Sequence, residues 1–234
     1  MFPHAPQLGA QARKLRSEKK IAQQDADALR VLAELQATTR ALLCARYGGC
    51  DAAGTQVVPY AVELELAFPA TMPDFAARGA GPERLRVELA PIALMPHAVH
   101  TFLEAMRGWK GGVFHRRAGH VLQAQLSART HGLAFQEYSP EFPHVKGTLG
   151  FAGRPGGPAF YISTLDNTRN HGPGSQNSAT EADSCFGKLA DKESEAVVER
   201  MKLQPGAKPP NGFVFPSENY IQIKSVKILT PAME

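Results

Sequence analysis

After residue 50, the sequence consists of short apolar runs that alternate with polar residues and are separated by glycine and proline. In the first run, Val57 to Phe68, apolar side chains fall on every second position, which is typical of a strand. Six more runs have the same texture: Leu85–Leu89, Val113–Leu126, Thr148–Ala152, Phe160–Ser163, Cys185–Leu189 and Ile221–Leu229. The apolar phase changes near Ser225 in the last run, which indicates either a β-bulge or a misplaced strand end there.

Only two helical patterns interrupt these runs. Pro96 suits the first position of a helix, and apolar residues recur at helical spacing from there to Gly108. The second helical pattern covers Lys192 to Met201. The segment 166–184 is polar and rich in asparagine, glycine and serine, so we expect a surface loop. Because strands and helices do not alternate, the pattern predicts a mainly β barrel with two capping helices.

The N-terminal part differs, because residues 13–46 contain no glycine or proline and predict one long helix that ends at Gly48-Gly49. Seven residues follow a weak heptad-like seam: Ile21, Asp25, Ala28, Leu32, Leu35, Thr39 and Leu42. Two interpretations stay open, a helix packed on its own domain and a coiled coil that binds a protein partner. We therefore divide the chain into a helical arm, residues 1–50, and a second domain, residues 51–234.

The composition is that of an ordinary globular protein, with 43% hydrophobic residues and a net charge of +4. The basic residues cluster in 13–20, which we interpret as a solvated helix face, and we predict no nucleic-acid partner. No apolar stretch is long enough to span a membrane, and the first 20 residues lack an apolar signal core. Cys44, Cys50 and Cys185 predict no disulfide framework. These absences favour an intracellular protein, with the cytoplasm as the expected compartment.

Several segments resemble the cyclophilin family of peptidyl-prolyl cis-trans isomerases, in the same order. Val113–Arg116 resembles the Phe-His-Arg strand of that family, and Gly119–Gln123 resembles the segment that carries its glutamine. Gly147–Ala152 and Phe160–Ile162 resemble the strands on either side of a glycine-rich loop. Cys185–Leu189 resembles the Val-Phe-Gly-Lys-Val strand, and the helix up to Met201 follows it as in the family.

The resemblance covers about residues 57–230 and carries expectations of fold and activity. It implies a closed eight-stranded antiparallel β-barrel capped by two helices, here preceded by the long N-terminal helix. It implies isomerisation of X-Pro bonds in a protein or peptide substrate, without metal or cofactor. His97 and His100 lie three apart on the first capping helix, but they lack the further ligands of a zinc site, so no metal is predicted.

The resemblance also implies the site residues. Arg116 would be the catalytic donor to the proline nitrogen, and Gln123 would orient Arg116 or bind the substrate carbonyl. The substrate would contact the wall and floor of a proline slot made by Val121, Leu122, Ala152, Phe160 and Tyr161. His171, in the polar segment 166–184, does not align with a family residue and is added as a further candidate substrate contact. A guanidinium suits the donor role, because it stays protonated and presents its N–H groups in a rigid plane.

Two departures from the family pattern point to an alternative function. The segment 165–184 lacks the tryptophan that the family has before its Phe-Gly-Lys strand, and Gly153 replaces an asparagine. The arginine of the family pattern is therefore present in this chain, but other residues of its proline slot differ. We expect an isomerase that could be slow, and the alternative is a catalytically weak or inactive cyclophilin-like binding module.

Overall fold

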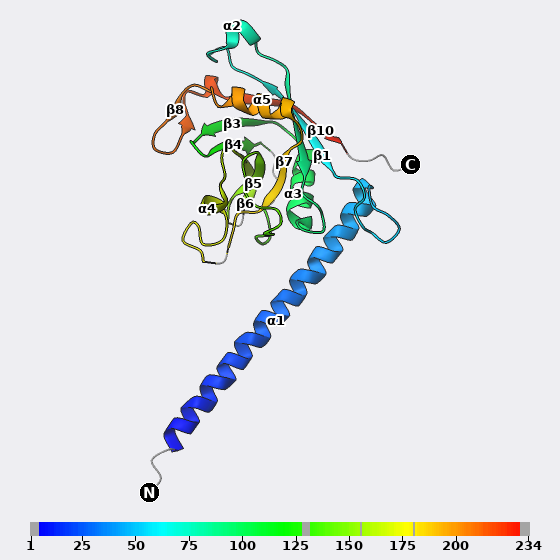
Figure 1. Ribbon diagram of the computed structural model, residues 1–234, viewed down its shortest axis with the longest axis vertical. Helices are drawn as coiled ribbons and strands as arrows, with labels where there is room; N and C mark the ends of the chain where they lie inside the picture. Colours follow the sequence, from blue (N-terminus) through cyan, green and yellow to red (C-terminus); the bar gives the residue numbers. More distant parts are fainter. Residues whose placement is uncertain (1–4, 128–131, 155, 180, 230–234) are drawn as a thin grey trace.

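A closed antiparallel β-barrel forms the body of the chain in the computed structural model, which describes residues 5–127, 132–154, 156–179 and 181–229 (Figure 1). Eight strands pair in the order β10-β1-β2-β7-β5-β6-β4-β3, and β10 also pairs with β3, which closes the barrel. The pair β9-β8 continues from β3. The mainly β prediction is therefore confirmed, and so is the closed eight-stranded barrel.

The strands agree with the runs of alternating apolar residues. Their bounds are β1 Ala61–Ala67, β2 Glu83–Leu89, β3 Gly112–Arg117, β4 Val121–Leu126, β5 Thr148–Gly153, β6 Gly156–Ser163, β7 Cys185–Leu189, β8 Ala207–Lys208, β9 Phe213–Val214 and β10 Ile221–Leu229. Of the two alternatives for the change of phase in β10, the bulge is confirmed. Glu65 on β1 pairs with Ser225 and Leu66 pairs with Ile223, so Lys224 is the extra residue.

Two amphipathic helices pack on the barrel, as predicted. Helix α3, Pro96–Arg107, begins with its proline and buries its apolar face in the core. Helix α5, Lys192–Met201, begins after Asp191, whose side chain accepts a hydrogen bond from Ser194 N. The remaining helical turns are short: α2 Phe75–Arg78, α4 Thr168–His171 and a 3-10 turn at Ser217–Asn219.

The arm is a single helix, α1, Ala5–Tyr47, which extends away from the barrel in Figure 1. Only its C-terminal part packs on the domain, with Leu43 and Tyr47 in the hydrophobic core. Of the predicted seam, Thr39 is buried, whereas Leu35 and Leu42 are exposed, and the Ile21 side chain lies outside the described residues. The helix thus packs on its own domain near its end. The coiled coil and the domain boundary at residue 50 stay predictions.

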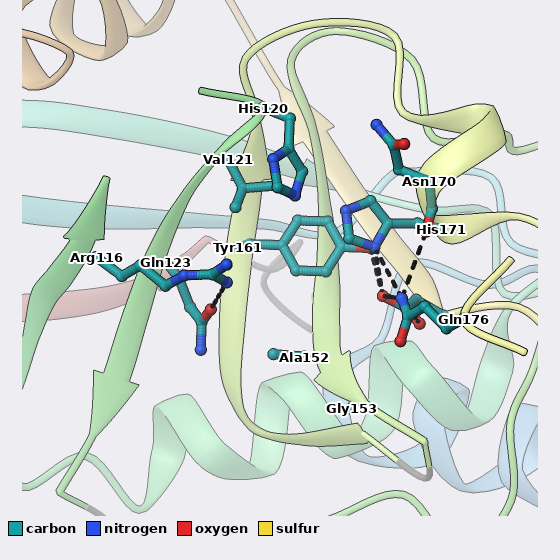
Figure 2. A pocket seen from close by; sticks show the side chains of 11 residues that line it. Arg116, His120, Val121, Gln123, Ala152, Gly153, Tyr161, Asn170, His171 and Gln176 are labelled. Atoms are coloured by element: carbon teal, nitrogen blue, oxygen red, sulfur yellow. Dashed lines mark hydrogen bonds and ion pairs between the residues drawn. The ribbon is translucent and has the colours of Figure 1, made fainter. Parts of the chain in front are cut away.

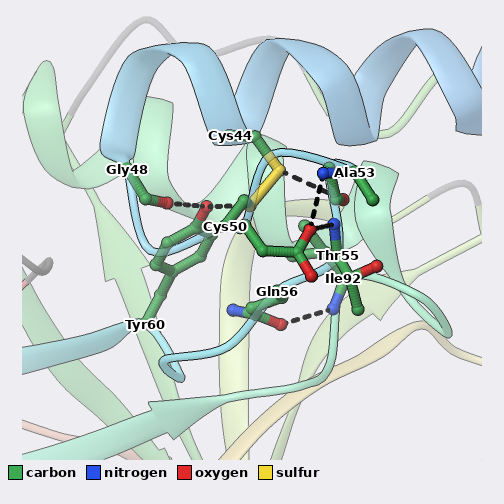
Figure 3. Close-up of a disulfide and its surroundings, with 10 residues drawn as sticks. Cys44, Gly48, Cys50, Ala53, Thr55, Gln56, Tyr60 and Ile92 are labelled. Atoms are coloured by element: carbon green, nitrogen blue, oxygen red, sulfur yellow. Dashed lines mark hydrogen bonds between the residues drawn. A yellow bond between two sulfur atoms is a disulfide. The ribbon is translucent and has the colours of Figure 1, made fainter.

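The cysteine prediction was wrong, because Cys44 and Cys50 form a disulfide at the end of α1 (Figure 3). The two intervening glycines explain the pair, since Gly48 and Gly49 both have positive φ and reverse the chain there. The hydroxyl of Tyr60 on the facing segment donates to Gly48 O at 2.8 Å. Disulfides are rare in the cytosol, so this pair argues against the cytoplasmic expectation.

No helix among the described residues is both long enough and apolar enough to cross a membrane.

Candidate functional site

A row of three side chains runs across the outer face of the barrel. Arg116 on β3 pairs with Gln123 on β4, and Gln123 pairs with Tyr161 on β6. The adjacent residues Ala124 and Phe160 pair with each other and are buried in the core. Because side chains alternate along a strand, the row of Arg116, Gln123 and Tyr161 faces away from the core.

A β-bulge places Arg116 in this row. Phe114 pairs with Ala124 and Arg116 pairs with Gln123, so His115 is an extra residue on β3. In a regular strand without a bulge, Arg116 would lie on the inner face together with the buried Phe114, because residues two apart share a face. The bulge therefore turns the guanidinium outward.

Two hydrogen bonds fix the plane of the Arg116 guanidinium. Its Nη1 donates to Gln123 Oε1 at 2.8 Å, and its Nε donates to Asn211 O at 2.7 Å. Burial lowers the pKa of Arg116 below its ordinary value. An arginine nevertheless keeps its charge in proteins, so the site presents a rigid cationic donor.

The row borders a cavity of about 450 Å³ on the outer face (Figure 2). Of the predicted site residues, Arg116, Val121, Gln123, Ala152, Tyr161 and His171 line this cavity. Leu122 and Phe160 do not line it, because both are fully buried in the barrel core. Five further residues line the cavity: His120, Gly153, Asn170, Gln176 and Asp183. Gly153 is the departure from the family pattern noted in the sequence, whereas Asn170, Gln176 and Asp183 were not predicted.

The far end of the cavity is built around the buried carboxylate of Asp183. It accepts hydrogen bonds from Arg154 Nε at 2.9 Å, from His171 Nδ1 at 2.6 Å and from Gln176 Nε2 at 3.2 Å. Burial alone would raise the pKa of Asp183, but the hydrogen bonds from His171 and Arg154 outweigh it and lower the pKa below its ordinary value. Asp183 is therefore ionised, and His171 carries a proton on Nδ1.

Arg154 holds the loop that contains Asp183. Besides Asp183, its guanidinium donates to Ser175 O and Glu181 O at 2.9 Å, to Ser175 Oγ at 2.6 Å and to His171 O at 3.2 Å. All five N–H donors of the arginine are thus used. The segment 166–184 is therefore folded onto the barrel around a buried ion pair, which corrects the prediction of a simple surface loop.

A second histidine completes this network. His144 is fully buried, and its Nε2 lies 2.8 Å from Asp183 O, so Nε2 donates and Nδ1 is the free acceptor. The hydroxyl of Tyr161 lies 3.2 Å from that Nδ1 and 3.3 Å from Asp183 Oδ2. Burial lowers the pKa of His144 to about 4, and burial beside the Asp183 charge raises the pKa of Tyr161 well above its ordinary value. Both side chains are therefore neutral at pH 7.

Tyr161 lies flat between two close neighbours. On one side, a Cβ atom added to Gly150 would lie 2.6 Å from the Tyr161 hydroxyl oxygen, so the ring requires glycine there. On the other side, His171 stacks on Tyr161 with ring centroids 4.4 Å apart and planes 25° apart. As a result only 2% of Tyr161 is exposed, although the residue borders the cavity.

The sequence offered little warning of this network. Arg154, Asp183 and His144 come from three segments that lack apolar periodicity and are joined only by the fold. The only local signal was that the segment 166–184 is polar and rich in asparagine, glycine and serine. Among the described residues, no group of three or more histidine, cysteine, aspartate or glutamate side chains could hold a metal ion.

Known proteins resemble this chain in structure, but none matches it in sequence. No family model matches the chain, and no curated protein sequence matches it. A cyclophilin-type peptidyl-prolyl cis-trans isomerase from Cryptosporidium parvum aligns with a TM-score of 0.53 and 18% identity, over 74% of this chain and 99% of that one. The chain has a cyclophilin-type fold.

Two further cyclophilin structures align less closely. The Cryptosporidium parvum protein in the presence of the dipeptide Ala-Pro gives a TM-score of 0.49 at 18% identity, over 73% of this chain and 99% of that one. A Mimivirus cyclophilin gives 0.47 at 13% identity, over 74% and 90% of the two chains. The barrel of this chain carries an arginine–glutamine pair at one end of an outer cavity and a buried polar network at the other.

Proposed function

We propose that the chain is a peptidyl-prolyl cis-trans isomerase that acts on exposed X-Pro segments of peptides or proteins. The observation that carries the proposal is the Arg116–Gln123 pair beside the cavity that Tyr161 borders. The cyclophilin-type fold supports this proposal, because a solved structure with the same fold is a peptidyl-prolyl cis-trans isomerase.

The chemistry requires no bond to break. Rotation about the X-Pro bond has a barrier of roughly 18–20 kcal/mol, because amide resonance is lost in the twisted state. In that state the proline nitrogen gains a localised lone pair, and a donor that reaches it binds the twisted state more tightly than either planar isomer. Arg116 has N–H groups beyond the two that bind Gln123 and Asn211, and these supply the donor.

An assay of isomer exchange on a short X-Pro peptide tests the proposal with wild type and Arg116→Ala. We expect the substitution to lower kcat/KM about a hundredfold, the effect of removing one oriented donor to a transition state. Arg117→Ala is the matched control, because Arg117 follows on the same strand and borders a separate pocket. Its rate should equal that of the wild type. Equal rates for wild type and Arg116→Ala would refute an isomerase that uses Arg116.

One observation favours a second function, a binding module without effective turnover. The Tyr161 ring, which would be the floor of the proline slot, is 2% exposed because His171 covers it. A pyrrolidine ring would find little aromatic surface on which to pack. Peptide binding that saturates without any Arg116-dependent acceleration would support this second function over the first.

A further inference from the structure

The His171 side chain lies where a substrate ring would have to pack. Its imidazole is a five-membered ring like pyrrolidine, and it stacks nearly parallel on Tyr161 at 4.4 Å. Figure 2 shows the ring between Tyr161 and Asn170, inside the wall of the cavity. Tyr161 is consequently covered even though no substrate is present.

The imidazole stacks on Tyr161 and on His120, but only one of its edges makes a hydrogen bond. Its Nδ1 donates to Asp183 Oδ2 at 2.6 Å, whereas its Nε2 is buried and has no hydrogen-bond partner among the described residues. A buried polar atom without a partner destabilises the conformation that contains it. Moving the ring toward solvent would give Nε2 a water partner, and this gain offsets part of the stacking that is lost.

Arg154 and Gln176 hold Asp183 through contacts that do not need the His171 imidazole, although Arg154 also donates to the His171 backbone oxygen. Arg154 reaches Asp183 through Nε and the loop backbone through its other donors, and Gln176 also donates to Asp183. The carboxylate would thus keep its place if the imidazole rotated away. The barrel and loop can remain folded in both positions of the ring.

We propose that His171 occupies the proline subsite, and that an X-Pro segment binds by displacing its imidazole from Tyr161. This inference rests on the proposed function, because it assigns Tyr161 to the proline subsite. The ring acts as an internal competitor that the substrate must replace. Wild-type turnover is therefore slower than the Arg116 site alone would permit.

The test is a gain of activity, measured as cis/trans exchange rates by NMR on an X-Pro peptide. We expect His171→Ala to raise kcat/KM about tenfold, the scale of one aromatic stacking contact. His171→Phe keeps a ring on Tyr161, so its rate should rise less than that of His171→Ala. An unchanged or lower rate in His171→Ala with a wild-type circular dichroism spectrum would overturn the inference.

The Arg116→Ala variant separates this inference from the proposed function. Arg116-dependent turnover in the wild type without a gain in His171→Ala refutes the displacement and leaves the isomerase intact. If neither wild type nor His171→Ala exceeds Arg116→Ala, the proposed function fails and the inference fails with it. A gain in His171→Ala that Arg116→Ala abolishes in the double variant supports both.

A measurement on the wild type covers the case in which His171→Ala does not fold. The Cε1–H resonance of His171 should be shifted upfield in the free chain by the Tyr161 ring, and it should move downfield as an X-Pro peptide saturates the site. A resonance that stays unchanged at saturation would overturn the inference, because the imidazole would then remain on Tyr161 in the complex.

Discussion

At one end of the cavity Arg116 is half-buried and held by two hydrogen bonds, whereas at the other end Asp183 is buried and accepts hydrogen bonds from Arg154, His171 and Gln176. The Arg116 end has N–H donors that are not used within the chain, whereas almost all donors at the Asp183 end are used. A group that must bind a changing substrate needs free hydrogen-bonding capacity, while a group that holds a loop uses its capacity within the chain. We therefore expect substitutions at Arg116 to affect rate, and substitutions at Arg154 and His144, which bind the side chain and backbone of Asp183, to affect stability.

The largest effect should come from Arg154→Met. This change removes the partner of a buried carboxylate and should lower the free energy of unfolding by about 4 kcal/mol. Urea unfolding followed by circular dichroism measures it. Arg84→Met is the control, because Arg84 is mostly exposed in its contact with Glu63 and should cost less than about 0.5 kcal/mol. Similar losses in both variants would contradict a stabilising role of the Asp183 network.

Low pH should lower the free energy of unfolding through the Asp183 end of the cavity. The pKa of His144 is lowered by burial to about 4 from an ordinary value of 6.5, so the folded chain binds this proton less readily than the unfolded chain. Stability is fully present above pH 6.5 and falls as the pH drops toward 4, by about 3 kcal/mol for this group. Urea unfolding at pH 7.5 and pH 4 measures the loss.

The variant His144→Gln isolates that contribution. Its amide can donate to Asp183 O, and it does not titrate. Burial also lowers the pKa of four other histidines, His97, His100, His115 and His120. Because these act in both chains, the difference between wild type and His144→Gln reports His144 alone. The same pH dependence in both chains would refute the assignment.

At the Arg116 end, Gln123→Ala should lower kcat/KM about tenfold, because Arg116 loses the hydrogen bond that orients it. The free energy of unfolding should change little, since Gln123 is only half-buried. Gln123→Glu keeps an acceptor and should restore most of the rate. Parallel losses of rate in the alanine and glutamate variants would show that the hydrogen bond has no part in turnover.

The smallest effect should come from Tyr161→Phe, which keeps the ring but removes the hydroxyl that bonds His144 Nδ1. We expect the free energy of unfolding to fall by about 1 kcal/mol, as for one buried hydrogen bond. Thermal unfolding measures the loss, and Tyr220→Phe, at the half-buried residue between the 3-10 turn and β10, serves as control. A Tyr161→Phe chain as stable as the wild type would place the hydroxyl outside the network.

The parts that sequence predicted are those with a local cause. Apolar alternation located the strands, Pro96 located the start of α3, and a change of phase near Ser225 located the bulge opposite Glu65. The resemblance to cyclophilins paired Arg116 with Gln123, which are seven residues apart on adjacent strands.

The parts that sequence missed depend on contacts between distant segments. Arg154 and Asp183 are separated by 29 residues, and each is an ordinary polar residue in a loop until the other neutralises it. The pairing of Cys44 with Cys50 likewise depends on the positive φ of the two glycines between them. The burial of polar side chains and the reversal of the chain leave no periodic pattern in the sequence, so they could not be predicted from it.

The helical arm sets the distance between its N-terminal end and the barrel. Helix α1 contains 43 residues, and at 1.5 Å per residue it is about 65 Å long. A flexible chain of the same length would average about 35 Å between its ends. The disulfide and the Tyr60 contact fasten the base of this rod beside the barrel. The far end of the helix therefore lies at a set separation from the barrel, whereas a flexible tether would leave that distance free to vary.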